Sequence, residues 1–165
     1  MDIKAAVERL EHSTEFSRWK KQHPNSFFAD AFMIFDDEGK THWQLGYYDA
    51  ASKKITVFVM EDVILVKQPG DVFKKENDAV LEVDLDKVAL DSGEALKKVR
   101  EVCILEYPAE KDVKTIFILQ HIKEGLVWNI TNITESLKTI NMKIDAGTGK
   151  VVGHKLVSLF EFRKK

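Results

Sequence analysis

The chain of 165 residues contains a single cysteine, Cys103. One thiol cannot form a disulfide within the chain, which is typical of proteins kept in a reducing compartment. Long apolar runs are also missing: no segment approaches the roughly 20 residues that cross a bilayer, and the opening residues MDIKAAVERLEHSTEF hold no apolar export signal. We therefore expect a cytoplasmic protein that does not insert into a membrane.

Charge of one sign is not in excess either. Lys and Arg number 25 against 27 Asp and Glu, which gives a net charge of −2. This balance supplies no general attraction to the phosphates of nucleic acid, so nucleic acid is not predicted as a partner. Hydrophobic content of 44% and charged content of 32% are typical of soluble globular proteins, and the length suits one domain or two packed halves.

Metal-binding and catalytic patterns are absent from the sequence. No zinc-type spacing of His with His or Cys occurs, and Cys103 falls on the apolar stripe of an expected helix without a base beside it. We therefore predict no catalytic residue, no cofactor and no metal, and we do not expect an enzyme. The histidines whose spacing does not fit a zinc site are His12, His23, His42, His121 and His154.

One glycine-rich segment, DAGTGK at residues 145–150, invites a phosphate-loop interpretation. That motif needs a glycine where Ile144 stands and Ser or Thr where Val151 stands. A tight turn between two strands is the better interpretation, because Gly accepts a positive φ and Asp can bond its own backbone.

Strand patterns dominate residues 126–153. Residues 127–134 are rich in β-branched and aromatic side chains, and residues 137–145 alternate apolar and polar positions with the period of a half-buried strand. Residues 150–156 return as a third strand after the glycine turn. The segment therefore predicts an antiparallel meander.

A looser copy of this meander occupies residues 41–66. Trp43 precedes Trp128 by 85 positions, and Asp49 precedes Thr134 by the same distance. The run at residues 31–35 likewise corresponds to residues 116–119. Element order and spacing together predict an internal duplication. The same offset aligns the alternating positions Ile55, Val57 and Val59 with Ile140, Met142 and Ile144.

Helical patterns precede each meander. Apolar residues at helical spacing fill residues 3–10, and a second short helix carries Phe16 and Trp19 before Pro24 ends it. Before the second meander, Asp91 or Ser92 can cap a helix that Pro108 ends. The chain is thus predicted to be α+β, with two pseudo-repeats that each pack a helix on an antiparallel meander.

Residues 117–152, FILQHIKEGLVWNITNITESLKTINMKIDAGTGKVV, resemble the end of a PepSY-type repeat. The resemblance implies a small PepSY/cystatin-like fold that occurs in propeptides of thermolysin-type metallopeptidases and in membrane-associated sensors. It also implies inhibition or regulation of partners without catalysis. Residues 1–75 would form the first repeat, 76–90 a connector and 91–165 the second repeat, a layout similar to that of mostly archaeal tandem proteins. Export is usual in the family, and this sequence departs from it by lacking a signal.

These patterns predict a non-catalytic binding or regulatory module that recognises a protein, peptide or ligand through its sheet faces. A small-molecule pocket between the two repeats is the alternative, and self-association through an edge strand at residues 63–66 is a further one. For the two tryptophans, packing in the core competes with a binding role. The residues predicted to bind the partner are Trp43, Tyr47, Tyr48, Trp128, Asn129 and Asn132.

Overall fold

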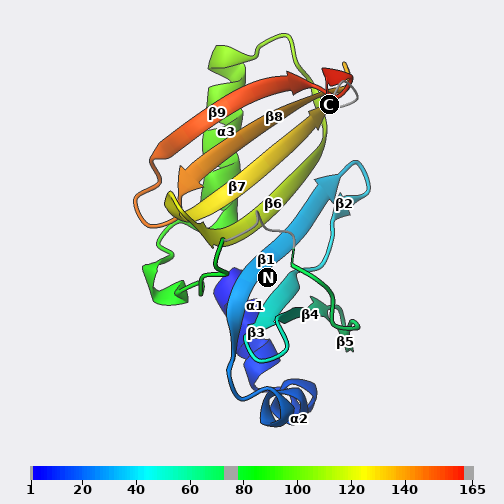
Figure 1. The fold of residues 1–165 in the computed structure, drawn as a ribbon. Helices are drawn as coiled ribbons and strands as arrows, with labels where there is room; N and C mark the ends of the chain where they lie inside the picture. The colour runs from blue at the N-terminus through cyan, green and yellow to red at the C-terminus, as the bar shows by residue number, and fades with distance from the viewer. Residues whose placement is uncertain (1, 73–77, 162–165) are drawn as a thin grey trace.

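The computed structural model describes residues 2–72 and 78–161 and shows an α+β protein (Figure 1). These residues form three α-helices, one 3-10 turn and nine strands. The helical elements are α1 (Ile3–Glu11), α2 (Thr14–Gln22), η1 (Leu85–Lys87) and α3 (Ser92–Glu106). The strands are β1 (Ser26–Asp36), β2 (Gly39–Lys40), β3 (Gln44–Asp49), β4 (Lys54–Met60), β5 (Ile64–Val66), β6 (Asp112–Ile122), β7 (Gly125–Thr134), β8 (Lys138–Asp145) and β9 (Val151–Ser158).

The helices begin and end where the sequence predicts. The Ser13 hydroxyl accepts a hydrogen bond from the Phe16 N–H at 3.1 Å and so caps α2. At the start of α3, the Asp91 carboxylate accepts from the Glu94 N–H while the Glu94 carboxylate accepts from the Asp91 N–H. This reciprocal capping box satisfies two amide groups that a helix start would otherwise leave without partners.

All strands belong to one antiparallel sheet, in the order β5-β4-β3-β1-β6-β7-β8-β9, with β2 paired to β1 alone. The strands before and after the connector meet at its centre, where β1 pairs with β6 and Phe32 stands opposite Ile118. This pairing makes the two predicted meanders continuous. Figure 1 shows β1 and β6 side by side in the middle of the sheet.

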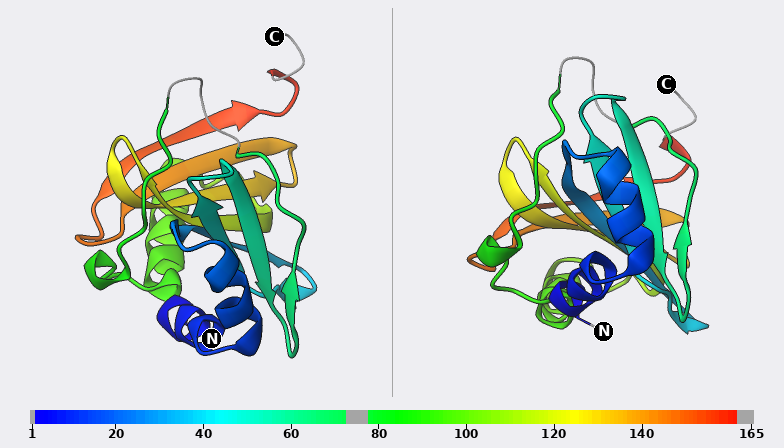
Figure 2. Two further views of the ribbon diagram at one scale, coloured as in Figure 1. Left: turned by 60° about the horizontal axis from the view of Figure 1, so that its bottom comes forward. Right: turned by 90° about the horizontal axis from the view of Figure 1, so that it is seen from below.

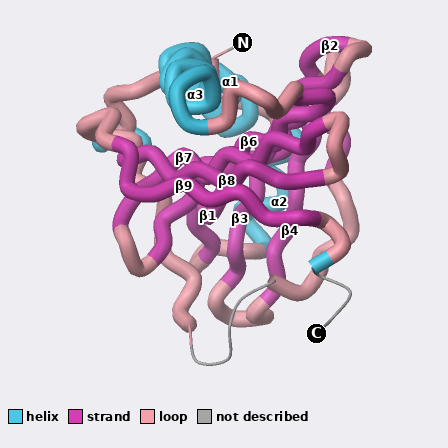
Figure 3. The backbone as a smooth tube through the Cα atoms, turned by 90° about the horizontal axis from the view of Figure 1, so that it is seen from above, coloured by secondary structure: helices cyan, strands magenta, loops and turns pink. Residues whose placement is uncertain are grey.

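The helices lie on one face of the sheet, and α1 and α3 are neighbours there (Figures 2 and 3). Alternate residues of the central strands point into the layer between helices and sheet, and both halves contribute to one apolar cluster. Its largest fully buried side chains include Leu10, Met33, Leu45, Phe58, Phe117, Leu119, Trp128, Ile130, Met142 and Ile144.

One detail of the predicted repeat is wrong. On the helix-facing side, Leu45 of β3 pairs with Phe58 of β4, and Ile130 of β7 pairs with Met142 of β8. Leu45 and Ile130 are 85 positions apart, as the repeat predicts, but Phe58 and Met142 are 84 positions apart. The first hairpin therefore holds one residue more, and a shift of one residue exchanges the two faces of a strand. As a result Ile55, Val57 and Val59 lie on the face away from the helices, whereas Ile140, Met142 and Ile144 lie on the face toward them.

The connector predicted at residues 76–90 is tied to both halves. The Val83 N–H donates to the Phe28 carbonyl at 2.8 Å, and the N–H groups of Ala89 and Leu90 both donate to the Ala146 carbonyl at 3.0 Å. Its predicted start, between residues 75 and 76, falls outside the described residues. The described part packs as an ordered strap across the junction of the halves.

The turn at residues 145–149 generates a stability prediction. Gly149 has φ +74°, and a Cβ there would lie 3.0 Å from Lys98 Cε. Gly149→Ala should therefore lower the free energy of unfolding by about 1 kcal/mol or more. Urea denaturation measures the change, and Gly153→Ala is the matched control because no atom lies within 4 Å of the added Cβ. Equal losses in both variants would contradict the turn assignment.

Candidate functional site

The six residues predicted to bind a partner do not form one surface. Trp43, Tyr47, Trp128 and Asn132 lie on the helix-facing side of the sheet, each no more than 2% exposed. Tyr48 and Asn129 are half-buried on the opposite face. A partner approaching either face of the folded protein would therefore meet at most a part of the predicted set.

The tryptophans pack in the core, which is the alternative that the sequence left open. Their ring centroids are 6.1 Å apart, so Trp43 and Trp128 touch beneath the central strands although they come from different halves. The Trp128 indole Nε1–H donates to the Leu90 carbonyl at 2.8 Å, which gives this buried polar group a partner.

Tyr47 and Asn132 occupy polar positions within the same layer. The Tyr47 hydroxyl donates to Glu11 Oε1 at 3.1 Å, and burial together with the Glu11 charge raises the pKa of Tyr47. Asn132 Nδ2 donates to Asp112 Oδ2 at 2.7 Å. Both side chains are thus held by neighbours within the fold.

A cavity of about 810 Å³ lies on the sheet face away from the helices. We call it the junction cavity, because β1 and β4 line it from the first half, β6, β7 and β8 from the second, and the connector closes one side. The residues that line it are Ala29, Asp30, Ile55, Val72, Asp78, Ala79, Val80, Leu81, Gln120, His121, Ile122, Lys123, Glu124, Asn129 and Lys143.

Asp30 is the most unusual group in the junction cavity. It sits in the middle of β1, among apolar residues, and its carboxylate lies over Gly46 of β3: a Cβ on Gly46 would be 2.5 Å from Asp30 Oδ1 and 2.8 Å from Ile55 Cδ1. The missing side chain at Gly46 makes the space that the carboxylate fills. Within residues 2–72 and 78–161, no hydrogen bond or ion pair is found for Asp30.

Burial raises the pKa of Asp30 from its ordinary value near 4 to about 6. The charged form is disfavoured because an apolar environment replaces water without providing a partner. At neutral pH the protein therefore holds an ionised carboxylate whose burial opposes folding. Such a group is more typical of a site than of a packing element.

Two amide side chains, Gln120 and Asn129, line the same cavity. Gln120 stands opposite Asp30 in the β1–β6 pairing. Asn129 Oδ1 accepts from Asn141 Nδ2 at 2.8 Å, and the same Asn141 nitrogen donates to Thr131 Oγ1 at 2.9 Å. No hydrogen bond from Asn129 Nδ2 is found within the described residues, so this group can donate to a molecule in the cavity.

The cationic side chain on the sheet floor of the cavity already has a partner. Lys143 Nζ lies 3.3 Å from Glu124 Oε1. This bond contributes to the lowered pKa of Glu124, after the larger effect of a backbone hydrogen bond. The pairing leaves Lys143 a weak candidate for neutralising Asp30.

A further cavity, of about 710 Å³, lies on the helix side where α1, α2 and residues 82–87 meet. Several of its polar groups are paired with one another: Tyr47 bonds Glu11, and Lys20 Nζ donates to the Ser26 carbonyl at 2.5 Å and to its hydroxyl at 2.9 Å. A site whose polar groups already satisfy one another gives less reason to expect a ligand. The junction cavity is therefore the stronger candidate.

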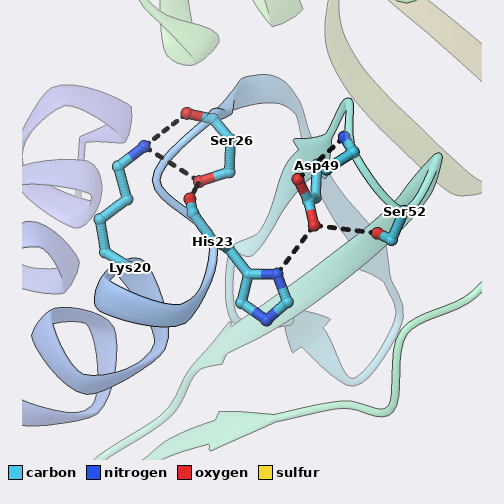
Figure 4. A network of polar contacts seen from close by, with 6 residues as sticks. Lys20, His23, Ser26, Asp49 and Ser52 are labelled. Atoms are coloured by element: carbon cyan, nitrogen blue, oxygen red, sulfur yellow. Dashed lines mark hydrogen bonds and ion pairs between the residues drawn. The ribbon is translucent and has the colours of Figure 1, made fainter.

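A His–Asp pair near the end of α2 has a structural explanation (Figure 4). His23 Nδ1 lies 2.9 Å from Asp49 Oδ2, and the Ser52 hydroxyl donates to the same oxygen at 3.0 Å. The hydrogen bond from His23 is the main cause that lowers the pKa of Asp49. Both nearby serines are engaged elsewhere, Ser52 with Asp49 and Ser26 with the His23 carbonyl, so neither is placed as a nucleophile that the imidazole activates. The pair fastens the end of α2 to β3.

Within the described part of the chain, no three His, Cys, Asp or Glu side chains are grouped closely enough to hold a metal ion. The same residues contain no helix with the length and apolarity needed to cross a membrane. Cys103 is half-buried, and burial raises the pKa of its thiol.

Asp30 is not among the predicted site residues because it lies in the otherwise apolar run of residues 27–35, a pattern that indicates a buried strand. A signal was present, since an isolated carboxylate within such a run has to be explained by a partner or by a function. The space at Gly46 could not be found in the same way, because it depends on the pairing of β1 with β3.

No protein-family model matches the chain, and no curated protein matches its sequence. The fold is similar to the crystal structure of a putative lipoprotein from Clostridium difficile 630, with a TM-score of 0.55. The two sequences are 9% identical, and the match covers 86% of this chain and 90% of that chain. At this identity the likeness concerns the fold alone.

Trp128→Ala tests the core assignment. Removing this fully buried indole should lower the free energy of unfolding by about 3–5 kcal/mol. Chemical denaturation followed by circular dichroism measures it, and Tyr48→Ala, on the half-buried outer face, should cost clearly less. A Trp128→Ala variant as stable as the parent would show that the indole is not a core group.

Asp30→Asn should stabilise the protein at neutral pH. The raised pKa means that the folded state holds a proton more tightly than the unfolded chain, so stability falls as pH rises from about 4 to 6 and the deficit persists above that range. The amide should therefore raise the free energy of unfolding at pH 7.5 by up to about 3 kcal/mol, with little difference at pH 4. Urea titrations at both pH values measure the effect. Asp71→Asn, an exposed control, should change little. A loss of stability in Asp30→Asn at pH 7.5 would show that the Asp30 carboxylate does not oppose folding.

Proposed function

We propose that the protein is a non-catalytic module that binds a small molecule in the junction cavity. The observation that carries the proposal is an ionised, half-buried carboxylate without a partner among the described residues, in a cavity that both halves line. Binding sites tend to lie at such junctions and to combine apolar walls with a few polar groups. Asp30, Gln120 and Asn129 would supply those polar groups.

The proposal includes the tandem organisation and the relation to PepSY-type repeats. Two features support it. A helical segment precedes each four-stranded meander, and in both halves the first long strand lies at the centre of the sheet while the later strands follow in chain order toward the edge. Pairing of two similar units along one strand each would create the junction, and with it a cavity that neither unit has alone. The proposed location is the cytoplasm, on the sequence evidence given above.

A protein or peptide partner is the second candidate, favoured by the exposed edge of the sheet. Residues 152–156 of β9 are exposed, and the nearby end of α3 presents Ile104 and Leu105 at 72% and 78% exposure. An added strand could pair with β9 while its side chains cover these apolar groups. A second copy of the chain could use the same edge.

Native mass spectrometry of the protein purified from its own host distinguishes the two candidates. Val80→Trp places a large ring at the wall of the junction cavity, whereas Val152→Trp changes β9 at a half-exposed valine. We expect a small-molecule adduct in the parent that disappears in Val80→Trp and persists in Val152→Trp.

A stoichiometric protein partner, or a dimer, that is lost only in Val152→Trp would favour the second candidate instead. An adduct that persists in both variants would contradict binding in the junction cavity. Melting temperatures of both variants serve as the folding control.

A further inference from the structure

Among the residues that the structure describes, no cationic side chain around the junction cavity pairs with Asp30. The described residues that line the cavity and can carry charge are Asp30, Asp78, His121, Lys123, Glu124 and Lys143. Lys143 is paired with Glu124, Lys123 acts electrostatically on the same Glu124, and His121 Nδ1 lies 2.8 Å from the Glu82 carbonyl. The cationic side chains thus gather at the β6–β7 hairpin, while Asp30 lies near β3 and β4.

Apolar side chains also line the cavity. Ile55 lies against the same Gly46 space that Asp30 occupies, and the connector contributes Val80 and Leu81 to the wall. A carboxylate without a cationic partner, in a cavity with apolar side chains in its wall, complements a molecule that carries one positive charge on an apolar body.

We propose that the junction cavity takes an organic amine, whose ammonium group pairs with Asp30 and whose apolar chain lies along Ile55, Val80 and Leu81. This inference rests on the proposed function and names the ligand class for that site. An ammonium group would supply the charge and the hydrogen-bond donors that the carboxylate lacks, and Asn129 Nδ2 could donate to an oxygen elsewhere on the ligand.

Other ligand classes fit the same groups less well. A divalent cation needs several oxygen donors together, and no cluster of three candidate ligand side chains exists within the described residues. An anionic ligand would meet the Asp30 charge, while Lys143 is already held by Glu124. A neutral ligand would leave the ionised carboxylate unpaired.

The proposal has a pH consequence with a definite sign. The pKa of Asp30 in the empty cavity is about 6, whereas an alkylamine stays protonated throughout this range. Lowering the pH from 7.5 to 5 should therefore weaken amine binding by roughly tenfold, because most of the carboxylate must first lose a proton. His121 also lines the cavity, so the assignment to Asp30 requires that the pH response disappear in Asp30→Asn.

Binding of hexylamine, with hexan-1-ol as the neutral probe of similar shape, tests the inference. Titrations of the full-length protein at constant ionic strength are followed by NMR through the side-chain amide signals of Gln120 and Asn129. We expect hexylamine to bind at least about tenfold more tightly than hexan-1-ol at pH 7.5, a difference of about 1.4 kcal/mol. Asp30→Asn should remove this preference, whereas Glu124→Gln, which changes another carboxylate of the cavity wall, should retain it.

Equal binding of the two probes, unaffected by Asp30→Asn, would overturn the amine assignment and leave small-molecule binding in the cavity intact. No response of the amide signals to either probe would also overturn it, and the mass-spectrometric adduct then decides the proposed function separately. An amine preference that survives in Asp30→Asn would show that another group recognises the cation. The pH series on the parent protein gives a second readout that needs no variant.

Discussion

The antiparallel pairing of β1 with β6 is the interaction on which the rest of the structure depends. Seven residue pairs, from Asp30 with Gln120 to Asp36 with Lys114, join strands that are about 85 positions apart in the chain. Without this pairing each half would end in an open strand whose backbone groups face solvent. With it, one sheet is formed whose two faces can be used differently.

On the helix side, the pairing allows one core to form. Trp43 and Trp128 belong to different β-meanders and are distant in the chain, yet their rings touch beneath the central strands. The carbonyl of Leu90 fixes the indole of Trp128, and the connector that supplies it is tied to both halves. Because the apolar cluster runs through both halves, we expect cooperative unfolding rather than two separate transitions.

On the other side, the same pairing produces the junction cavity. Asp30 stands at the end of the β1–β6 ladder, beside the space left by Gly46, and it opposes folding at neutral pH because its charge is desolvated. A residue that lowers stability while lining a cavity supports the proposed binding of a ligand there. The two faces therefore differ in kind: helices cover one, and the other holds the carboxylate of Asp30 in a cavity.

Local sequence determined the elements of this protein. The cap at Asp91, the glycine turn at residues 145–149 and the alternating strands lie within a few residues of the groups they organise, so periodicity and turn chemistry were sufficient to predict them. Tertiary structure alone decided the rest. One extra residue in the β3–β4 hairpin decided which side chains of β4 face the helices. The sequence did not reveal this shift, because β4 has apolar side chains on both faces. The pairing of distant strands decided whether Trp43 would face a binding partner or pack against Trp128. It also decided whether the carboxylate of Asp30 would be solvated or enclosed. Such pairings depend on the packing of the whole sheet, and no local pattern in the chain specifies them.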